Sequence, residues 1–164
     1  MGVFSLDLVE FDRLTRRMAL EGEWRPAVER LSAAVAEHTS IRDYLHGEKV
    51  VQGFLAAYLS ASGYFVFHTE MELAKGYADI VLAPLSERYP GMRHGFVIEL
   101  KYVPRGPQAK AQGPANAAEA VAQLRRYLAD GRLARRYPDA EFTGVALVFR
   151  GWELVRTDEV TVPA

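Results

Sequence analysis

The stretch "HGFVIELKYV", residues 94–103, decides how the rest of the chain is interpreted. Side chains of a β-strand alternate between two faces. One face of this strand would carry only apolar or aromatic side chains, namely Phe96, Ile98, Leu100 and Tyr102. The other would carry Glu99 and Lys101 between two valines. Buried charges are costly unless they are paired or bound to an ion, so the strand predicts a polar site inside a sheet protein.

Length and composition indicate one ordinary globular domain. The chain has 164 residues, of which 49% are hydrophobic and 25% are charged. It contains no cysteine, which excludes disulfides, thiolate metal sites and a cysteine nucleophile. The first residues, "MGVFSLDLVEFDRLTRR", lack the apolar run of a signal peptide, and no stretch is long enough to span a membrane. We expect a soluble cytoplasmic protein.

The net charge of −1 conceals a basic segment. Residues 101–136 hold eight basic and two acidic side chains, so this segment is positive and the remainder is negative. Such a segment can bind phosphates, and it can equally be the solvated face of a helix.

Periodicity and turn residues predict an α-β-β-β-α-β core preceded by helices, a central mixed sheet with flanking helices. We expect helices within 5–20, 22–38 and 41–62, and a fourth over 117–137. Expected strands cover 64–73, 77–85 and 94–103, with two more in 142–156 around a turn at Arg150 and Gly151. The stretch "VPRGPQAKAQGPAN", residues 103–116, is typical of a long polar loop.

Other elements that should pack inward also carry polar groups. Asp79 is the only acid in "YADIVLAPL", residues 77–85, and Glu48 interrupts an apolar helical stripe. Gln123 and Tyr127 lie one helical turn apart, beside an apolar row. Each position also has an ordinary interpretation: an edge-strand pair for Glu99 and Lys101, a hydrogen-bonding Asp79, or a rim position for Glu48.

Carboxylate ligands without cysteine or clustered histidine suit a hard divalent cation such as Mg²⁺ or Mn²⁺. The histidines at 38, 46, 68 and 94 show no ligand spacing. A cation would compensate Asp79 and Glu99, and Lys101 could orient a water or stabilise charge on a phosphate. The chemistry that this favours is phosphodiester hydrolysis.

The pair "GYADIVL" and "FVIELKY" resembles the D…ExK signature of the PD-(D/E)XK nuclease superfamily, with Asp79, Glu99 and Lys101 at the three motif positions. "QLRRY", residues 123–127, resembles the Q-x-x-x-Y element of RecB-like members. More narrowly, the run from about Glu48 through Tyr127 resembles the nuclease-like C-terminal domain of bacterial AAA-ATPase-like proteins, and the resemblance covers roughly residues 41–150. The resemblance implies a restriction-endonuclease-like domain over 41–164 and a helical extension or linker over 1–40.

The resemblance also implies roles for individual residues. Asp79, Glu99 and Glu48 would bind Mg²⁺ or Mn²⁺, Lys101 would assist the attacking water, and Gln123 and Tyr127 would position phosphate or water. The expected nucleic-acid contacts are Lys101, Arg105, Lys110, Arg125 and Arg126. The implied activity is a metal-dependent nuclease acting on DNA more than RNA.

Two departures and one alternative accompany the resemblance. Tyr77 stands where the related domains usually have arginine, and the loop after residue 103 is longer than expected. No "GxxxxGK[ST]" motif occurs, so any ATPase partner must be supplied elsewhere. The alternative is a catalytically silent module that docks nucleic acid or an AAA-ATPase partner.

Overall fold

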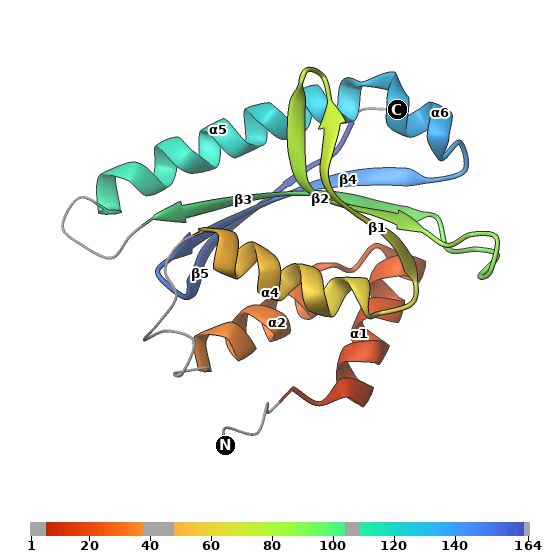
Figure 1. The fold of residues 1–164 in the computed structure, drawn as a ribbon, viewed down its shortest axis with the longest axis horizontal. Helices are drawn as coiled ribbons and strands as arrows, with labels where there is room; N and C mark the ends of the chain where they lie inside the picture. Colours follow the sequence, from red (N-terminus) through yellow and green to blue (C-terminus); the bar gives the residue numbers. More distant parts are fainter. Residues whose placement is uncertain (1–5, 38–47, 104–108, 163–164) are drawn as a thin grey trace.

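The computed structural model describes residues 6–37, 48–103 and 109–162. Five labelled helices and five strands follow one another along these ranges (Figure 1). The helices are α1 (Leu8–Glu21), α2 (Arg25–Glu37), α4 (Glu48–Ser60), α5 (Ala109–Ala129) and α6 (Gly131–Arg136). The strands are β1 (Phe65–Leu73), β2 (Gly76–Pro84), β3 (His94–Val103), β4 (Glu141–Arg150) and β5 (Glu153–Val160).

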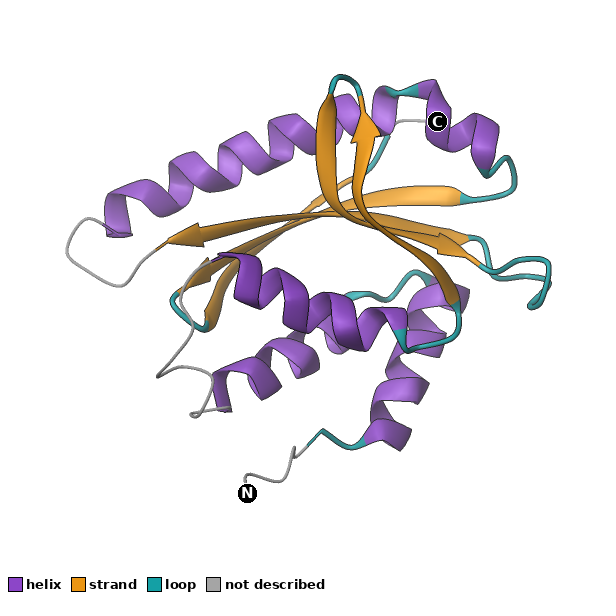
Figure 2. Ribbon diagram, viewed as in Figure 1, coloured by secondary structure: helices purple, strands orange, loops and turns teal. Residues whose placement is uncertain are grey.

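The strands form one mixed sheet in the order β1-β2-β3-β4-β5. Neighbours pair antiparallel except β3 and β4, which are parallel and joined through α5 and α6. Helices cover both faces of the sheet, α5 and α6 on one side and α1, α2 and α4 on the other (Figure 2). We call these the α5 face and the α4 face. The expected α/β fold with a central mixed sheet and flanking helices is confirmed.

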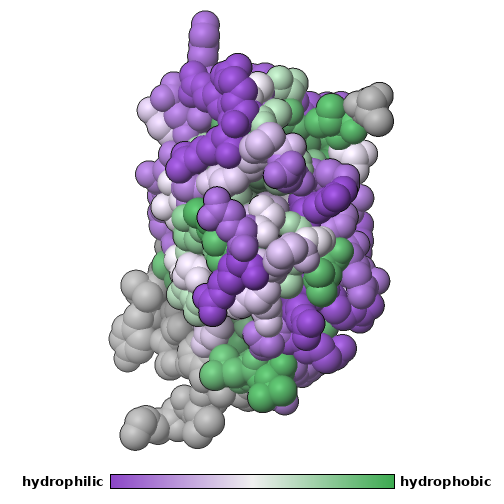
Figure 3. Space-filling view, turned by 90° about the vertical axis from the view of Figure 1, so that its right-hand side faces the viewer, coloured by the Kyte–Doolittle hydropathy of each residue, from purple (hydrophilic) through white to green (hydrophobic). Residues whose placement is uncertain are grey.

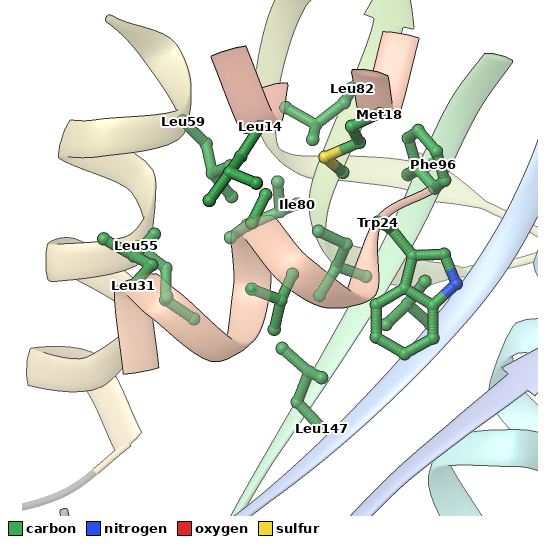
Figure 4. Packing of buried hydrophobic residues seen from close by; sticks show 14 of the residues in the cluster. Leu14, Met18, Trp24, Leu31, Leu55, Leu59, Ile80, Leu82, Phe96 and Leu147 are labelled. Carbon is green, nitrogen blue, oxygen red and sulfur yellow. The ribbon is translucent and has the colours of Figure 1, made fainter. Parts of the chain in front are cut away.

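The α4 face holds the main hydrophobic core. Apolar side chains from three helices and from β1 to β4 interlock there (Figure 4). Leu55 and Leu59 of α4 are fully buried against this core, as the apolar stripe on that helix predicts. The alternate residues of β3 also behave as predicted, since Phe96, Ile98 and Leu100 all belong to this core.

The α5 face has a smaller apolar cluster. It joins Val81 and Val97 of the sheet to Leu124 of α5 and Leu133 of α6. Beside this cluster, the same face of β3 carries Glu99, whose side chain is buried with only 3% exposed. The division of β3 into an apolar face and a face with charges is therefore present in the folded chain.

The helices α1 and α2 pack into the same core as the sheet. The cluster on the α4 face includes buried apolar residues of both helices, from Phe11 on α1 to Val35 on α2. Trp24 Nε1 donates to the Glu159 carboxylate at 2.6 Å, and Arg25 Nη1 donates to Thr157 Oγ1 at 2.7 Å. These bonds fasten the start of α2 to β5. The expected boundary near residue 40 falls within 38–47, outside the described residues, and stays a prediction.

Two expected boundaries are wrong. The polar stretch over 103–116 is not a loop throughout, because α5 already begins at Ala109 and includes Pro114. Alanine is the strongest helix former, and its high density in this stretch outweighs the glycine and proline signals. The helix expected over 117–137 is interrupted at Asp130, whose carboxylate accepts from Arg132 N and starts α6. The described part of α4 begins at Glu48, and the start expected near residue 41 lies outside the described residues and stays a prediction.

The face of the molecule in Figure 3 is mainly hydrophilic, with apolar side chains gathered in small patches. Within the described ranges, no helix combines the length and apolar character needed to cross a bilayer.

Candidate active site

Asp79 on β2 and Glu99 on β3 meet where their strands stop pairing. The antiparallel register runs from Leu82 and Phe96 to Ile80 and Ile98 and includes no further pair. One more step would place Asp79 opposite Glu99. Instead, side chains replace the backbone ladder. Asp79 N donates to Glu99 Oε1 at 3.2 Å, and Leu100 N donates to Asp79 Oδ2 at 2.8 Å.

A third side chain completes the hydrogen bonding of Asp79. Gln52 of α4 is buried, and its Nε2 donates to the Asp79 carbonyl at 3.2 Å. On the β1 side, Glu70 has a φ of 53° and the register skips the pair of Glu70 and Asp79. The backbone of Asp79 is thus held largely by side chains, and both neighbouring strands are irregular at that point. Such local irregularity is common where a strand presents a functional side chain.

The two carboxyl groups share an environment that disfavours negative charge. Burial and, after it, the charge of the adjacent Asp79 raise the pKa of Glu99 to about 8. Burial also raises the pKa of Asp79, against the opposing effect of the hydrogen bond from Leu100 N. The carboxyl groups are close enough to hydrogen-bond to each other when one is protonated. A proton bound by this pair would compensate the negative charge that a bound cation could compensate instead.

Lys101 lies on the same face of β3 and lowers the pKa of both carboxyl groups by its positive charge. Its side chain is 18% exposed, and its Nζ lies 3.3 Å from Oε1 of the more exposed Glu119 on α5. Lys101 is therefore held beside the pair by a residue on the covering helix. Among the described residues, Lys101 forms no direct ion pair with Asp79 or Glu99.

The helix α5 brings Gln123 and Tyr127 over the same site. Tyr127 is buried, its hydroxyl donates to the Tyr77 carbonyl at 3.3 Å, and burial followed by the Glu99 charge raises its pKa. Gln123 lies one turn from Glu119 and one turn from Tyr127. Its Oε1 is buried and has no hydrogen-bond partner among the described residues. A buried amide oxygen in this state can accept a hydrogen bond from a water molecule or a ligand.

The remaining predicted residues divide into two groups. Arg125 and Arg126 are exposed on α5 and can meet a phosphate backbone. Glu48 is the first residue of α4, but its side chain lies outside the description, as does that of Lys110; Arg105 falls in the undescribed range 104–108. Their assigned roles stay predictions.

The donor set fits a hard divalent cation in part. Among the described side chains, no group of three or more acids or histidines could hold a metal ion. Asp79 and Glu99 supply two carboxylates, and Mg²⁺ commonly takes one or two carboxylates while retaining several waters. The unpartnered Gln123 Oε1 can accept a hydrogen bond from such a water.

Sequence reasoning missed two residues at this site. Gln52 was not singled out, although it is a polar residue beside the apolar stripe of α4, one turn after Glu48. Glu119 was not among the predicted site residues, although it lies one helical turn before Gln123, and its contact with Lys101 was not foreseen. In both cases the polar residue on a packing helix was the available signal.

Comparison with known proteins gives one finding. A family model described as the PD-(D/E)XK nuclease superfamily matches residues 46–159, which is more than half of the chain. The matched region begins just before α4, and it contains β1 to β4, β5 as far as Glu159, and every site residue described above. No curated protein matches the chain.

Proposed function

The chain belongs to the PD-(D/E)XK nuclease superfamily, and from this premise we propose that it hydrolyses phosphodiester bonds of nucleic acid with the help of Mg²⁺ or Mn²⁺. The observation that carries the proposal is the pair of half-buried Asp79 and buried Glu99, with Lys101 on the same face of β3 as Glu99. DNA is the proposed substrate ahead of RNA, and the cytoplasm is the proposed location.

The roles of the residues follow from their positions. Asp79 and Glu99 would hold the cation, with Glu48 as a further ligand. When bound, the cation would supply an activated water and neutralise charge on the phosphate. Lys101 would stabilise the charge that grows on the phosphate or orient the attacking water, as its place beside the pair allows. Gln123 would accept a hydrogen bond from water through its unpartnered Oε1.

The substrate would be held by positive side chains outside the carboxylate pair. Arg125 and Arg126 lie exposed on α5, the helix that covers the site. Phosphate contacts of this kind add affinity without sequence preference and weaken with salt. We propose the same role for Arg105 and Lys110.

The test is cleavage of single-stranded, duplex and branched DNA, with RNA as a further substrate, in Mn²⁺ or Mg²⁺. The proposal expects products that disappear with EDTA and in Lys101→Ala. Arg156→Ala is a suitable control, because Arg156 is an exposed cation on β5 paired with Asp158 and is not part of the proposed site. Equal cleavage by Lys101→Ala and the wild-type chain would remove Lys101 from the mechanism.

A silent docking module is the second candidate. It is favoured by the contact of Lys101 Nζ with Glu119, which occupies the lysine without a substrate. Such a module would bind nucleic acid or an AAA-ATPase partner and would cleave nothing. Binding of DNA without cleavage under any metal condition would support it over the nuclease.

A further inference from the structure

We propose that Glu119 of α5 occupies the place beside Lys101 that a substrate phosphate takes, and that nucleic acid displaces this carboxylate when it binds. The inference rests on the proposed function for the class of ligand. It adds to the site a residue outside the predicted set, and it makes Glu119 a determinant of how tightly the substrate is held.

Three carboxylates lie near the ammonium group of Lys101, and it contacts only one of them. Its charge lowers the pKa of Asp79 and of Glu99, so both acids are within electrostatic reach. Among the described residues, however, the acid within ion-pair distance is Glu119, whose Oε1 lies 3.3 Å from Nζ. The ammonium group therefore pairs with the covering helix α5 rather than with the motif acids. An anion that takes the place of the Glu119 carboxylate would meet a cation next to the carboxylate pair.

The two partners of this ion pair differ in their freedom to move. The Lys101 side chain is only 18% exposed, and it belongs to a strand that pairs with β4 along its whole length. The Glu119 side chain is 60% exposed, so it can turn away and stay hydrated. Ion pairs near the surface contribute little to stability, and breaking this one costs correspondingly little. The pair therefore opens by movement of Glu119, which leaves Lys101 in place for a new anion.

Glu119 is the only acid in the sequence of α5. The helix otherwise carries one lysine and two arginines, to which the proposed function assigns the phosphate backbone of the substrate. A negative charge on such a helix repels a polyanion and so opposes binding. This charge stands at the position where it meets Lys101. The carboxylate is therefore placed to neutralise the lysine until nucleic acid arrives.

A phosphodiester is the anion that can replace the carboxylate. Like a carboxylate, it carries one negative charge spread over two oxygens, so it can take over the charge-assisted contact with the ammonium group. Among the described residues, Glu119 forms an ion pair with Lys101 alone. A phosphate backbone bound along α5 would also meet the exposed Arg125 and Arg126. These additional contacts decide the competition for Lys101 in favour of nucleic acid.

The test measures binding without catalysis. Fluorescein-labelled DNA, as a single strand and as a duplex, is titrated with the full chain in EDTA and followed by fluorescence anisotropy. We expect Glu119→Gln to bind DNA roughly threefold more tightly than the wild-type chain, because Lys101 no longer has a competing partner. In the Lys101→Ala background the same substitution should give a clearly smaller gain, since it then relieves only the repulsion between Glu119 and DNA.

Glu87→Gln is the matched control, because it removes one negative charge from an exposed acid in the segment between β2 and β3. It should change DNA affinity by less than about twofold, since solvent and salt screen a charge away from the site. Equal DNA binding by Glu119→Gln and the wild-type chain overturns the inference. A gain of the same size in the Lys101→Ala background also overturns it, because Glu119 would then act by repulsion alone. Failure of the wild-type chain to cleave in Mn²⁺ overturns the proposed nuclease instead and leaves the comparison of binding unaffected.

Discussion

The two faces of the sheet are built by different rules. On the α4 face, large apolar side chains from α1, α2, α4 and four strands fill the space. On the α5 face, the apolar cluster is smaller, and Glu99 is buried beside it with Asp79 at its side. The α4 face therefore mainly stabilises the fold. The α5 face holds carboxylates whose burial costs stability, and such costly groups are typical of a site that binds a ligand.

The faces are joined at one residue. Gln52 belongs to α4, yet its amide reaches the carbonyl of Asp79. The well-packed face therefore supports the backbone of the residue whose carboxylate the other face uses. Substitutions on the α4 face should therefore lower mainly stability, and substitutions of the acids should lower mainly activity. A substitution of Gln52 should lower activity indirectly, because Gln52 positions the backbone of Asp79.

The largest expected effect is loss of cleavage in Asp79→Ala. Removing one motif acid should lower kcat by about a thousandfold or more, because the groups of such a site act together. The thermal midpoint in EDTA should change little, because the removal of a carboxylate in an unfavourable environment offsets the loss of its hydrogen bond from Leu100 N. Parallel measurements of cleavage rate and thermal midpoint check this. A fall in both would show that Asp79 serves the fold as well as the site.

The counterpart on the α4 face is Leu55→Ala. Leu55 is fully buried in the main core, so the free energy of unfolding should fall by about 2–5 kcal/mol. Denaturant titration measures this change, and cleavage by the protein that remains folded should be near the wild-type rate. Val155→Ala on exposed β5 serves as control and should change stability by no more than about 0.5 kcal/mol. A loss of activity in folded Leu55→Ala would contradict the claim that the α4 face serves stability and the α5 face serves activity.

Glu99→Gln tests the electrostatic difference between the faces. The folded-state pKa of Glu99 is raised to about 8 by burial and by Asp79, from an ordinary value of 4.5. Between these two pH values the unfolded chain has lost the proton while the folded chain still holds it. The stability of the metal-free protein should therefore fall as pH rises from about 4.5 to 8. A glutamine has no such proton, and the variant should gain several degrees in thermal midpoint over the wild-type chain across that range. Glu119→Gln, on an exposed acid, is the control.

Melting curves in EDTA at pH 5, 7 and 9 provide the measurement. The advantage of Glu99→Gln should be smallest at pH 5 and largest at pH 9. An advantage independent of pH would mean that burial does not disfavour the Glu99 charge.

The smallest expected effect is that of Gln52→Leu. The change removes the donor to the Asp79 carbonyl and also a buried Oε1 that has no partner among the described residues. Stability should therefore change little, while kcat falls roughly tenfold at constant KM, because Asp79 is less well positioned. Ser32→Ala removes another unpartnered buried oxygen, on α2, and should leave kcat unchanged. A wild-type kcat in Gln52→Leu would show that the hydrogen bond from Gln52 to the Asp79 carbonyl is not needed for activity.

Much of this organisation could be predicted from local sequence. The strand over residues 94–103 and its two faces follow from alternation, and β3 spans the predicted residues. The convergence of α5 on the site was also expected, since Gln123 and Tyr127 share a helical face. These features depend on periodicity, which neighbouring residues determine by themselves.

The rest depends on contacts between distant segments. Alternation cannot show that the ladder between β2 and β3 stops at Ile80, nor that Gln52 takes the carbonyl that is left free. The start of α5 at Ala109 could not be predicted from local signals alone, because glycine and proline indicate a loop in the same stretch in which frequent alanines favour a helix. The break at Asp130 was missed because its capping role was not considered, although Asp followed by Gly is a recognisable signal.

The central claim is that Asp79 and Glu99 together bind a divalent cation on the α5 face. Its most direct test is Mn²⁺ titration of the purified chain, followed by the electron paramagnetic resonance signal of free Mn²⁺, for the wild-type protein and for Asp79→Asn. The account predicts that the wild-type chain depletes free Mn²⁺ and that Asp79→Asn does so far more weakly. Equal depletion by both proteins, or none by the wild-type chain at millimolar Mn²⁺, would contradict it.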